Sequence, residues 1–522
     1  MTLQRKEGSA VPQGRRKTPP TRGVKHPGGG KGSPDPQQVR QLELPLATAE
    51  APATEADGGR ATQLRVASPR AAPKVRVKNR RDVPATMEEV VDALRDAFSN
   101  VARNKGAPGP DGRSISWVRK HLEEILPEVS RELQEGTYVP GNIRRVWIPK
   151  SSGGLRGLGI PDVVDRMVME AVRLVLEPLY EPTFHPQSHG FRPGRSCHTA
   201  VSEARAHVED GYGWVVDLDL EKFFDQVNHQ RLLARLSQRV GDRRILKLIS
   251  RLLKAKVVLP DGVLVHTEQG VPQGGPLSPL LSNIVLDELD SELVQRGLRF
   301  VRYADDCNVY VRSERAGQRV MASLNRFIAK RLRLRVNQEK SAVARPEERH
   351  FLGFRVCREE LDGGSEVRLS KRSKDRIDAR IRELTPRHYG DSLQACIAAT
   401  NRYLAGWLGF FGICTGPETE RVLRGLDAHI RRRLRVIQLQ HWKRKRTRAH
   451  KLIQLGVRPK TAWRNVYQGR KSLWALSHTP AAHRGLRNAF FAERGLMSLW
   501  ERWWEKTHPA VDAPEQLWLA LG

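Results

Sequence analysis

The segment FVRYADDCNVYV, residues 300–311, constrains the fold more than any other part of the sequence. Its two largely apolar arms alternate around a central acidic pair, a pattern that predicts two β-strands joined by a tight turn. Such a hairpin would carry Asp305 and Asp306 at its tip. An isolated pair of aspartates is usually an ordinary turn, so a chemical role for this pair depends on the rest of the chain.

A second predicted strand supplies a third carboxylate. The segment WVVDLDL, residues 214–220, is apolar except for Asp217 and Asp219, which share one face because strand side chains repeat every two residues. A carboxylate in a buried strand is unfavourable unless it is paired or bound to a cation. Asp219, Asp305 and Asp306 would together form a site for two Mg²⁺ ions about 3.5–4 Å apart, as used for in-line phosphoryl displacement. The sequence therefore predicts that these three residues are catalytic metal ligands.

Two glycine-rich segments are candidates to face a nucleotide. Lys150 and Arg156 flank the bend SSGGLRG, and their cations could close on a triphosphate, although such a bend is often only an exposed hairpin. The segment QGVPQGGPLSP, residues 269–279, lacks the spacing and the Lys-Ser/Thr ending of a P-loop. Its glycines would allow the backbone to approach a base pair or sugar closely.

The charge balance points to a polyanionic partner. The chain has 522 residues, with 90 Lys and Arg against 58 Asp and Glu, and a net charge of +32, which disfavours most small-molecule metabolic enzymes. Residues 1–82 are rich in Pro, Gly, Ser, Lys and Arg, a composition that predicts a disordered basic extension, either a nucleic-acid arm or only a solvating tail. Five scattered cysteines and no long apolar run predict a reduced, cytoplasmic protein without a membrane partner.

Periodicity divides the remaining chain into an α/β region and a helical region. A helix is expected to start near Thr86 and to end at the glycine of NKGAPGPDG, and further helices are expected at 162–179, 230–236, 279–294 and 319–332. Strands are expected at 144–150 and 156–161, and a hairpin at 257–267. After Leu369 the pattern changes to long, basic, amphipathic helices that contain many tryptophans. The tryptophans at 474, 500, 503 and 504 are expected to pack between helices rather than to stack on bases.

One basic helix is predicted to contact RNA. The segment RRRLRVIQLQHWKRKRTR, residues 431–448, has nine Lys and Arg with an interleaved tryptophan, which suits phosphate contacts and base stacking. A merely solvated helix face is the alternative. The predicted RNA-binding residues are Arg431, Arg432, Arg433, Lys443, Arg444, Lys445 and Arg446.

The order of the motifs resembles that of the group II intron-encoded reverse transcriptases, also called maturases. The matching segments, in chain order, are NKGAPGPDG, IPKSSGGLRGLGIPDVVDRMV, SHGFRPGRSCHTA, DLDLEKFFDQVNH, QGVPQGGPLSPLLSNIVLDELD, YADD, NQEKS and FLGFRV. The resemblance covers roughly residues 86–460, and the helical part resembles the thumb and maturase region of that family. The paired cysteines of an HNH endonuclease do not follow, so the resemblance is to the endonuclease-lacking branch.

This resemblance assigns roles to individual residues. It implies that Asp219, Asp305 and Asp306 bind the catalytic metals and that Lys150 and Arg156 contact the triphosphate. Phe224 matches the aromatic residue under the incoming sugar, where a flat apolar surface excludes a 2′-hydroxyl, and Gln273 matches the residue that supports the nucleotide–template pair. Of the neighbours Phe223 and Phe224, one is expected to belong to the core.

The expected fold class is an α/β fingers–palm polymerase, a right-hand reverse transcriptase, followed by an α-helical thumb/maturase domain. The expected domains are a basic extension (1–82), fingers and palm (83–365), thumb/maturase (366–455) and a basic DNA- or RNA-binding module (456–522). The resemblance implies an RNA-directed DNA polymerase that uses two Mg²⁺ ions and dNTPs on an RNA template/DNA primer hybrid. It also implies binding of the intron RNA, assistance of its splicing, and reverse transcription of that RNA after its insertion, with target DNA as a further partner. The alternatives are a relative that serves repair or defence, and a non-catalytic splicing cofactor.

Overall fold

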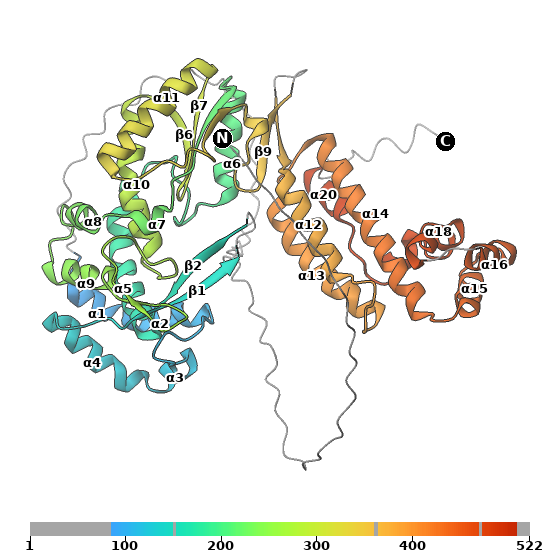
Figure 1. The fold of residues 1–522 in the computed structure, drawn as a ribbon, viewed down its shortest axis with the longest axis horizontal. Coiled ribbons are helices and arrows are strands. Elements are labelled where there is room, and N and C mark those ends of the chain that lie inside the picture. The colour runs from blue at the N-terminus through green and yellow to red at the C-terminus, as the bar shows by residue number, and fades with distance from the viewer. Residues whose placement is uncertain (1–84, 150–152, 360–363, 469–471, 509–522) are drawn as a thin grey trace, which may run out of the picture. The chain divides into compact units, whose positions relative to one another are not determined.

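The computed structural model describes residues 85–149, 153–359, 364–468 and 472–508 (Figure 1). The predicted basic extension (1–82) and Lys150 lie outside the described residues. An α/β region is followed by an all-helical region, and this order confirms the expected fold class. No helix in the described part of the chain is long and apolar enough to cross a bilayer.

The central sheet brings together strands that are far apart in the sequence. It has the order β6-β7-β3-β8, in which every neighbouring pair is antiparallel. Its strands are β3 (Trp214–Leu218), β6 (Arg299–Tyr303), β7 (Asp306–Val311) and β8 (Ala342–Ala344). The predicted hairpin at 300–311 is therefore confirmed, with a turn at Ala304 and Asp305.

The side chains of each strand point alternately to the two faces of the sheet. Both faces carry apolar residues, and each face packs against a hydrophobic core. Val216 and Val309 join one hydrophobic core with α5 (Val163–Tyr180), α10 (Ser278–Gln295) and α11 (Glu314–Phe327). Val215 and Tyr310 join a second core with α6 (Cys197–Glu209) and the helical region. The sheet is therefore held in the interior, and its polar loops lie at its ends.

A second sheet has the order β2-β1-β4-β5. Strands β1 (Ile143–Pro149) and β2 (Leu155–Ile160) form an antiparallel hairpin, and β1 also pairs in parallel with β4 (Val257–Val258). A turn connects strand β4 to β5 (Leu264–Val265), and the two strands pair antiparallel. In this turn Gly262 has the positive φ of +85° that the predicted Asp-Gly turn requires.

The remaining elements of the α/β region are mostly short. They are α1 (Met87–Asp92), α2 (Leu94–Arg103), α3 (Ile115–Lys120), α4 (Leu122–Glu135), η1 (Glu181–Thr183), α7 (Phe223–Gln226), α8 (His229–Leu236), α9 (Arg243–Leu253), η2 (Ile328–Leu332) and η3 (Pro346–Glu348). Thr86 and Glu89 form the capping box that begins the first helix. The helix expected from Thr86 to the glycine of NKGAPGPDG is divided in two at Ala93, a turn residue that ends α1 and precedes α2.

The C-terminal region is helical apart from the antiparallel pair β9 (Phe354–Arg358) and β10 (Ser365–Leu369) that precedes it. Its helices are α12 (Lys371–Leu384), α13 (Leu393–Phe411), α14 (Gly416–His441), α15 (Lys445–Gln454), α16 (Pro459–Tyr467), α17 (Leu473–Leu476), α18 (Pro480–Gly485), α19 (Asn488–Ala492) and α20 (Leu499–Thr507) (Figure 1). The continuous basic helix expected at 431–448 is wrong. Helix α14 ends at His441, and Lys443 takes a φ of +27°, which breaks the helical hydrogen-bond pattern before α15 begins.

Candidate active site

The three predicted catalytic carboxylates lie at or directly beside the ends of the neighbouring strands β3 and β7. Leu218 of β3 pairs with Cys307 of β7, and the next step of the same register sets Asp219 opposite Asp306. The Asp219 backbone is fixed by the NQEKS segment, because its N–H donates to Ser341 Oγ at 2.9 Å and its carbonyl accepts from the Asn337 N–H at 2.8 Å. Asp305 lies in the turn directly before Asp306.

The electrostatics show that these carboxylates repel one another. Burial raises the pKa of Asp306 to about 7, and the charges of Asp305, Asp217 and Asp219 contribute to that rise. Burial also raises the pKa of Asp305, and the Asp219 charge adds to that effect. Buried carboxylates whose pKa values are raised by one another's charges fit a divalent cation, which would offset both the repulsion and the cost of desolvation.

A lysine stands close to this acidic group. The ammonium of Lys340 lies 3.0 Å from Asp219 Oδ2, and its charge offsets part of the rise in the pKa of Asp306. The negative charge of Asp217 is balanced by another residue, because Arg349 donates to Asp217 Oδ2 at 2.6 and 2.8 Å. In the side-chain conformations of the described residues, no three acidic, imidazole or thiol groups surround a single ion position. The donor set nevertheless has the chemistry of a Mg²⁺ site, and a protein cation already contacts one member of it.

Two of the predicted nucleotide-binding residues, Arg156 and Gln273, are connected to strand β2. Arg156 is an exposed residue of β2, and its charge offsets part of the rise in the pKa of Asp305. The carbonyl of Gln273 accepts from the Gly159 N–H at 2.7 Å, so the 269–279 loop is attached to β2. Gly274 has a φ of +126°, and a Cβ there would lie 2.4 Å from the Gly159 oxygen, which explains the need for glycine.

The structure separates the two phenylalanines of α7. Phe223 is 2% exposed and belongs to the core, whereas Phe224 is partly buried and packs against that core. The carbonyl of Phe224 accepts from the Val271 N–H at 2.6 Å, so Phe224 lies beside the same glycine-rich loop. This arrangement matches the expectation that only one of the pair belongs to the core.

The predicted RNA-binding residues fall into two groups. Arg432 stacks on Trp474 at 3.9 Å, and Arg433 donates to the carbonyl of Thr385, so both side chains contact the protein itself. Arg431 is half-buried. The four residues around the helix break are exposed: Lys443, Arg444, Lys445 and Arg446.

The predicted tryptophans mostly pack as expected. Trp503 is buried and donates to the Cys414 carbonyl at 2.8 Å, and Trp500 lies under the Arg424 guanidinium at 4.0 Å. Trp504 differs, because it remains 41% exposed and stacks on His508.

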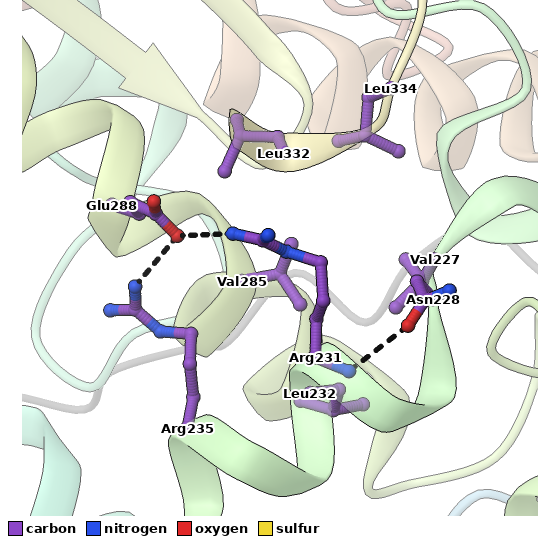
Figure 2. A pocket seen from close by; sticks show the side chains of 9 residues that line it. All are labelled: Val227, Asn228, Arg231, Leu232, Arg235, Val285, Glu288, Leu332 and Leu334. Atoms are coloured by element: carbon purple, nitrogen blue, oxygen red, sulfur yellow. Dashed lines mark hydrogen bonds and ion pairs between the residues drawn. The ribbon is translucent and has the colours of Figure 1, made fainter. Parts of the chain in front are cut away.

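A small pocket lies between α8, α10 and η2, and ion pairs connect two of these elements across it (Figure 2). Its volume is about 10 Å³, room for about one water molecule. Arg231 and Arg235 both contact Glu288 across it, at 3.3 and 3.1 Å, and these ion pairs tie α8 to α10. None of the predicted site residues lines this pocket.

Two charged residues near the site are not predicted from the sequence. Lys340 belongs to the NQEKS motif, but nothing in that motif alone indicates its contact with Asp219. Arg302 is fully buried in β6. The sequence could have indicated a buried partner for it, since a charged residue inside an otherwise apolar strand requires one.

Comparison with known proteins matches both regions. The family "Reverse transcriptase (RNA-dependent DNA polymerase)" matches residues 148–356, and "Group II intron, maturase-specific domain" matches residues 374–454. Protein YkfC of Escherichia coli (strain K12) is 31% identical over 366 residues, which cover 62% of this chain and 92% of that protein. The group II intron-encoded protein LtrA of Lactococcus lactis subsp. cremoris is 40% identical over 207 residues, 40% of this chain but only 34% of its own length.

The two matched domains occur in the order in which the α/β and helical regions follow each other along the chain. The match to YkfC also extends over most of that relative. The chain belongs to the family of group II intron-encoded reverse transcriptases with a maturase domain.

Proposed function

We propose that this protein is an RNA-directed DNA polymerase that also binds a group II intron RNA, assists its splicing and copies it during intron mobility. The observation that carries the polymerase assignment is the set of mutually repelling carboxylates, Asp219, Asp305 and Asp306, at the end of the central sheet. A scaffold that only bound RNA would gain nothing from acidic groups beside phosphates.

Asp219, Asp305 and Asp306 would hold two Mg²⁺ ions, which when bound stabilise the attacking and leaving oxygens of nucleotidyl transfer. The chain itself must orient the substrate. Arg156 would donate to the triphosphate of a dNTP, as its position near Asp305 allows. Lys150 is proposed for the same role on the basis of the motif alone.

Selection of the sugar is assigned to Phe224. Its side chain is partly buried, and its carbonyl accepts a hydrogen bond from Val271 in the loop that contains Gln273. A flat apolar surface there offers neither room nor a hydrogen-bond partner for a 2′-hydroxyl. Gln273 would support the nucleotide and the template base opposite it, because the Gly159 contact fixes the backbone of that loop.

Intron RNA is assigned to the helical region, with the proposed thumb/maturase domain at 366–455 and a basic module at 456–522 that would contact RNA or target DNA. The exposed residues from Lys443 to Arg446 would neutralise backbone phosphates. Arg432 and Arg433 would act mainly by holding this region together, since their guanidinium groups already contact the protein.

The test is primer extension on an RNA template with the full chain, dNTPs and Mg²⁺. Full-length cDNA that requires Mg²⁺, together with faster splicing of the group II intron RNA in which the gene resides, is the expected result. Extension without splicing assistance would favour a repair or defence role. Splicing assistance without any extension would favour the non-catalytic cofactor.

A further inference from the structure

Arg302 of β6 lies beneath the acidic turn, and each of its side-chain donors has a hydrogen-bond acceptor. It is fully buried, and all five of its side-chain N–H groups have acceptors. The acceptors are Asp290 Oδ1 at 2.7 Å, Asp290 Oδ2 at 2.5 Å, Asn283 Oδ1 at 3.0 Å, the Ala304 carbonyl at 2.9 Å and Ser188 Oγ at 2.6 Å. One guanidinium therefore connects helix α10, the 188–190 loop and the turn that carries Asp305.

The 188–190 loop runs along the outer side of β6. The His189 N–H donates to the Arg302 carbonyl at 2.8 Å, and the Arg302 N–H donates to the Gln187 carbonyl at 2.9 Å. Asn283 Nδ2 donates to the Gly190 carbonyl at 2.9 Å. The loop is thus fixed to the same strand and the same helix as the Arg302 side chain.

Gly190 makes the closest approach to the turn. A Cβ built on Gly190 would lie 2.2 Å from the Ala304 nitrogen and 3.0 Å from its Cα. These are backbone atoms, which cannot rotate away as the end of a flexible side chain could. Any side chain at position 190 must therefore displace either the loop or the turn.

The turn itself has an unfavourable backbone conformation. Ala304 has a φ of +56°, a left-handed value that residues other than glycine rarely adopt without support from their surroundings. The bond from Arg302 to the Ala304 carbonyl and the contact of Gly190 supply that support.

We infer that Gly190, Ser188 and the Arg302–Asp290 pair form a positioning cluster that fixes the backbone of the Ala304–Asp305 turn, and so the placement of both carboxylates. The inference rests on the proposed polymerase function. These residues act through the turn and do not touch the substrate. Their loss should lower the rate of the chemical step and leave binding of the hybrid intact.

The first test replaces Gly190 with Ala and compares the variant with Gly241→Ala, where a Cβ would have no neighbour within 4 Å. Gly190→Ala should lower the single-turnover rate of nucleotide addition by about 100-fold, the cost of a misplacement near 1 Å. Its dissociation constant for the RNA/DNA hybrid should stay within about twofold of the wild type. Backbone amides at 303–307 should exchange hydrogen faster than in Gly241→Ala.

A second pair of variants covers the case in which Gly190→Ala does not fold. Ser188→Ala removes one acceptor of Arg302, and Ser282→Ala removes an equally buried hydroxyl that donates only to the Ser278 carbonyl within α10. Ser188→Ala should slow the chemical step about tenfold, as expected when a charged group is deprived of one hydrogen bond, while Ser282→Ala should not.

The outcomes separate this inference from the proposed function. A wild-type protein without Mg²⁺-dependent extension would overturn the polymerase assignment and, with it, the cluster's role in catalysis. An active wild type in which folded Gly190→Ala or folded Ser188→Ala extends primers at the rate of its control would overturn the positioning cluster alone. A loss of hybrid binding equal to the loss of rate would also overturn it, since a general structural defect produces that pattern.

Discussion

Around the β6–β7 hairpin, several acidic residues have few cations beside them to balance their negative charge. Along α14 and α15, by contrast, several basic side chains form hydrogen bonds with other parts of the protein. At the hairpin, Asp305 and Asp306 have raised pKa values, and Lys340 is the cation that contacts their neighbour Asp219. In the helices, Arg433 reaches the carbonyls at the end of α12, and the buried Arg435 donates to the Leu486 carbonyl at 2.9 Å.

The difference teaches how charge should be weighed in such a chain. A charged residue with all its hydrogen bonds made inside the protein holds the fold together, even in a strongly basic segment. A cluster of like charges without enough partners marks a place where a ligand is required. Each of the following predictions tests one side of this distinction.

The largest effect is expected from removing an uncompensated carboxylate. Asp305→Ala should abolish primer extension, by about 1,000-fold or more, because the metals supply several kcal/mol of transition-state stabilisation. Hybrid affinity should stay near the wild-type value. The control is Asp261→Ala, another hairpin-turn aspartate, whose neighbour Val263 donates to it at 3.2 Å. Comparable extension by both variants would remove the basis of the catalytic assignment.

The exposed cations should matter for RNA affinity. Neutralising Lys443, Arg444, Lys445 and Arg446 together should weaken intron RNA binding and reduce the slope of log affinity against log salt. The slope should fall by roughly 0.9 for each duplex phosphate that is no longer neutralised, and by about 0.7 for each single-strand phosphate. Filter binding over a salt series measures the slope, and circular dichroism verifies the fold. An unchanged slope would mean that this stretch is only a solvated surface.

The two phenylalanines of α7 should respond differently. Phe224→Ala should increase incorporation of rNTPs relative to dNTPs by about tenfold, as expected when a site no longer excludes a hydroxyl. Phe223→Ala removes a core side chain and should instead lower the free energy of unfolding by about 3–5 kcal/mol. If the rNTP/dNTP ratio changes only in a folded Phe223 variant, the assignment of the two residues is reversed.

The smallest effect is expected from an inward-facing arginine. Arg433→Gln should lower the free energy of unfolding by about 1–3 kcal/mol, because the carbonyl and hydroxyl of Thr385 lose their donor. The salt slope of RNA binding should stay that of the wild type. Thermal denaturation combined with the same filter-binding series checks both; a flattened slope at unchanged stability would place Arg433 on the RNA instead.

The hairpin could be predicted because its signal is local. Residues 300–311 carry both strands and the turn between them, and alternation of side chains suffices to recognise them. The partnership with Asp219 follows from a second apolar strand that carries otherwise unexplained acidic residues. By contrast, the partner of Arg433 lies 48 residues away at Thr385, and no periodicity in α14 indicates it.

Other differences also depend on contacts between distant segments. The sequence predicts that one of Phe223 and Phe224 is buried, but the choice between them is made by the core around α7 and by the loop bound to Phe224. The helix break at Lys443 could not be predicted, because no glycine or proline lies beside it in the sequence. Arg302 could have been suspected of having a partner, but its acceptor Asp290 is on another element.

The strand order β6-β7-β3-β8 has a consequence for biosynthesis. Strand β3 ends at Leu218, and its two neighbours begin only at Asp306 and Ala342. At about 5–20 residues per second, the ribosome needs on the order of ten seconds to produce them. During that interval an apolar strand and the aspartate beside it lack their native strand partners. We therefore expect the nascent chain to depend on the early helices α1 to α5 for protection of its apolar surface until the last strand has emerged.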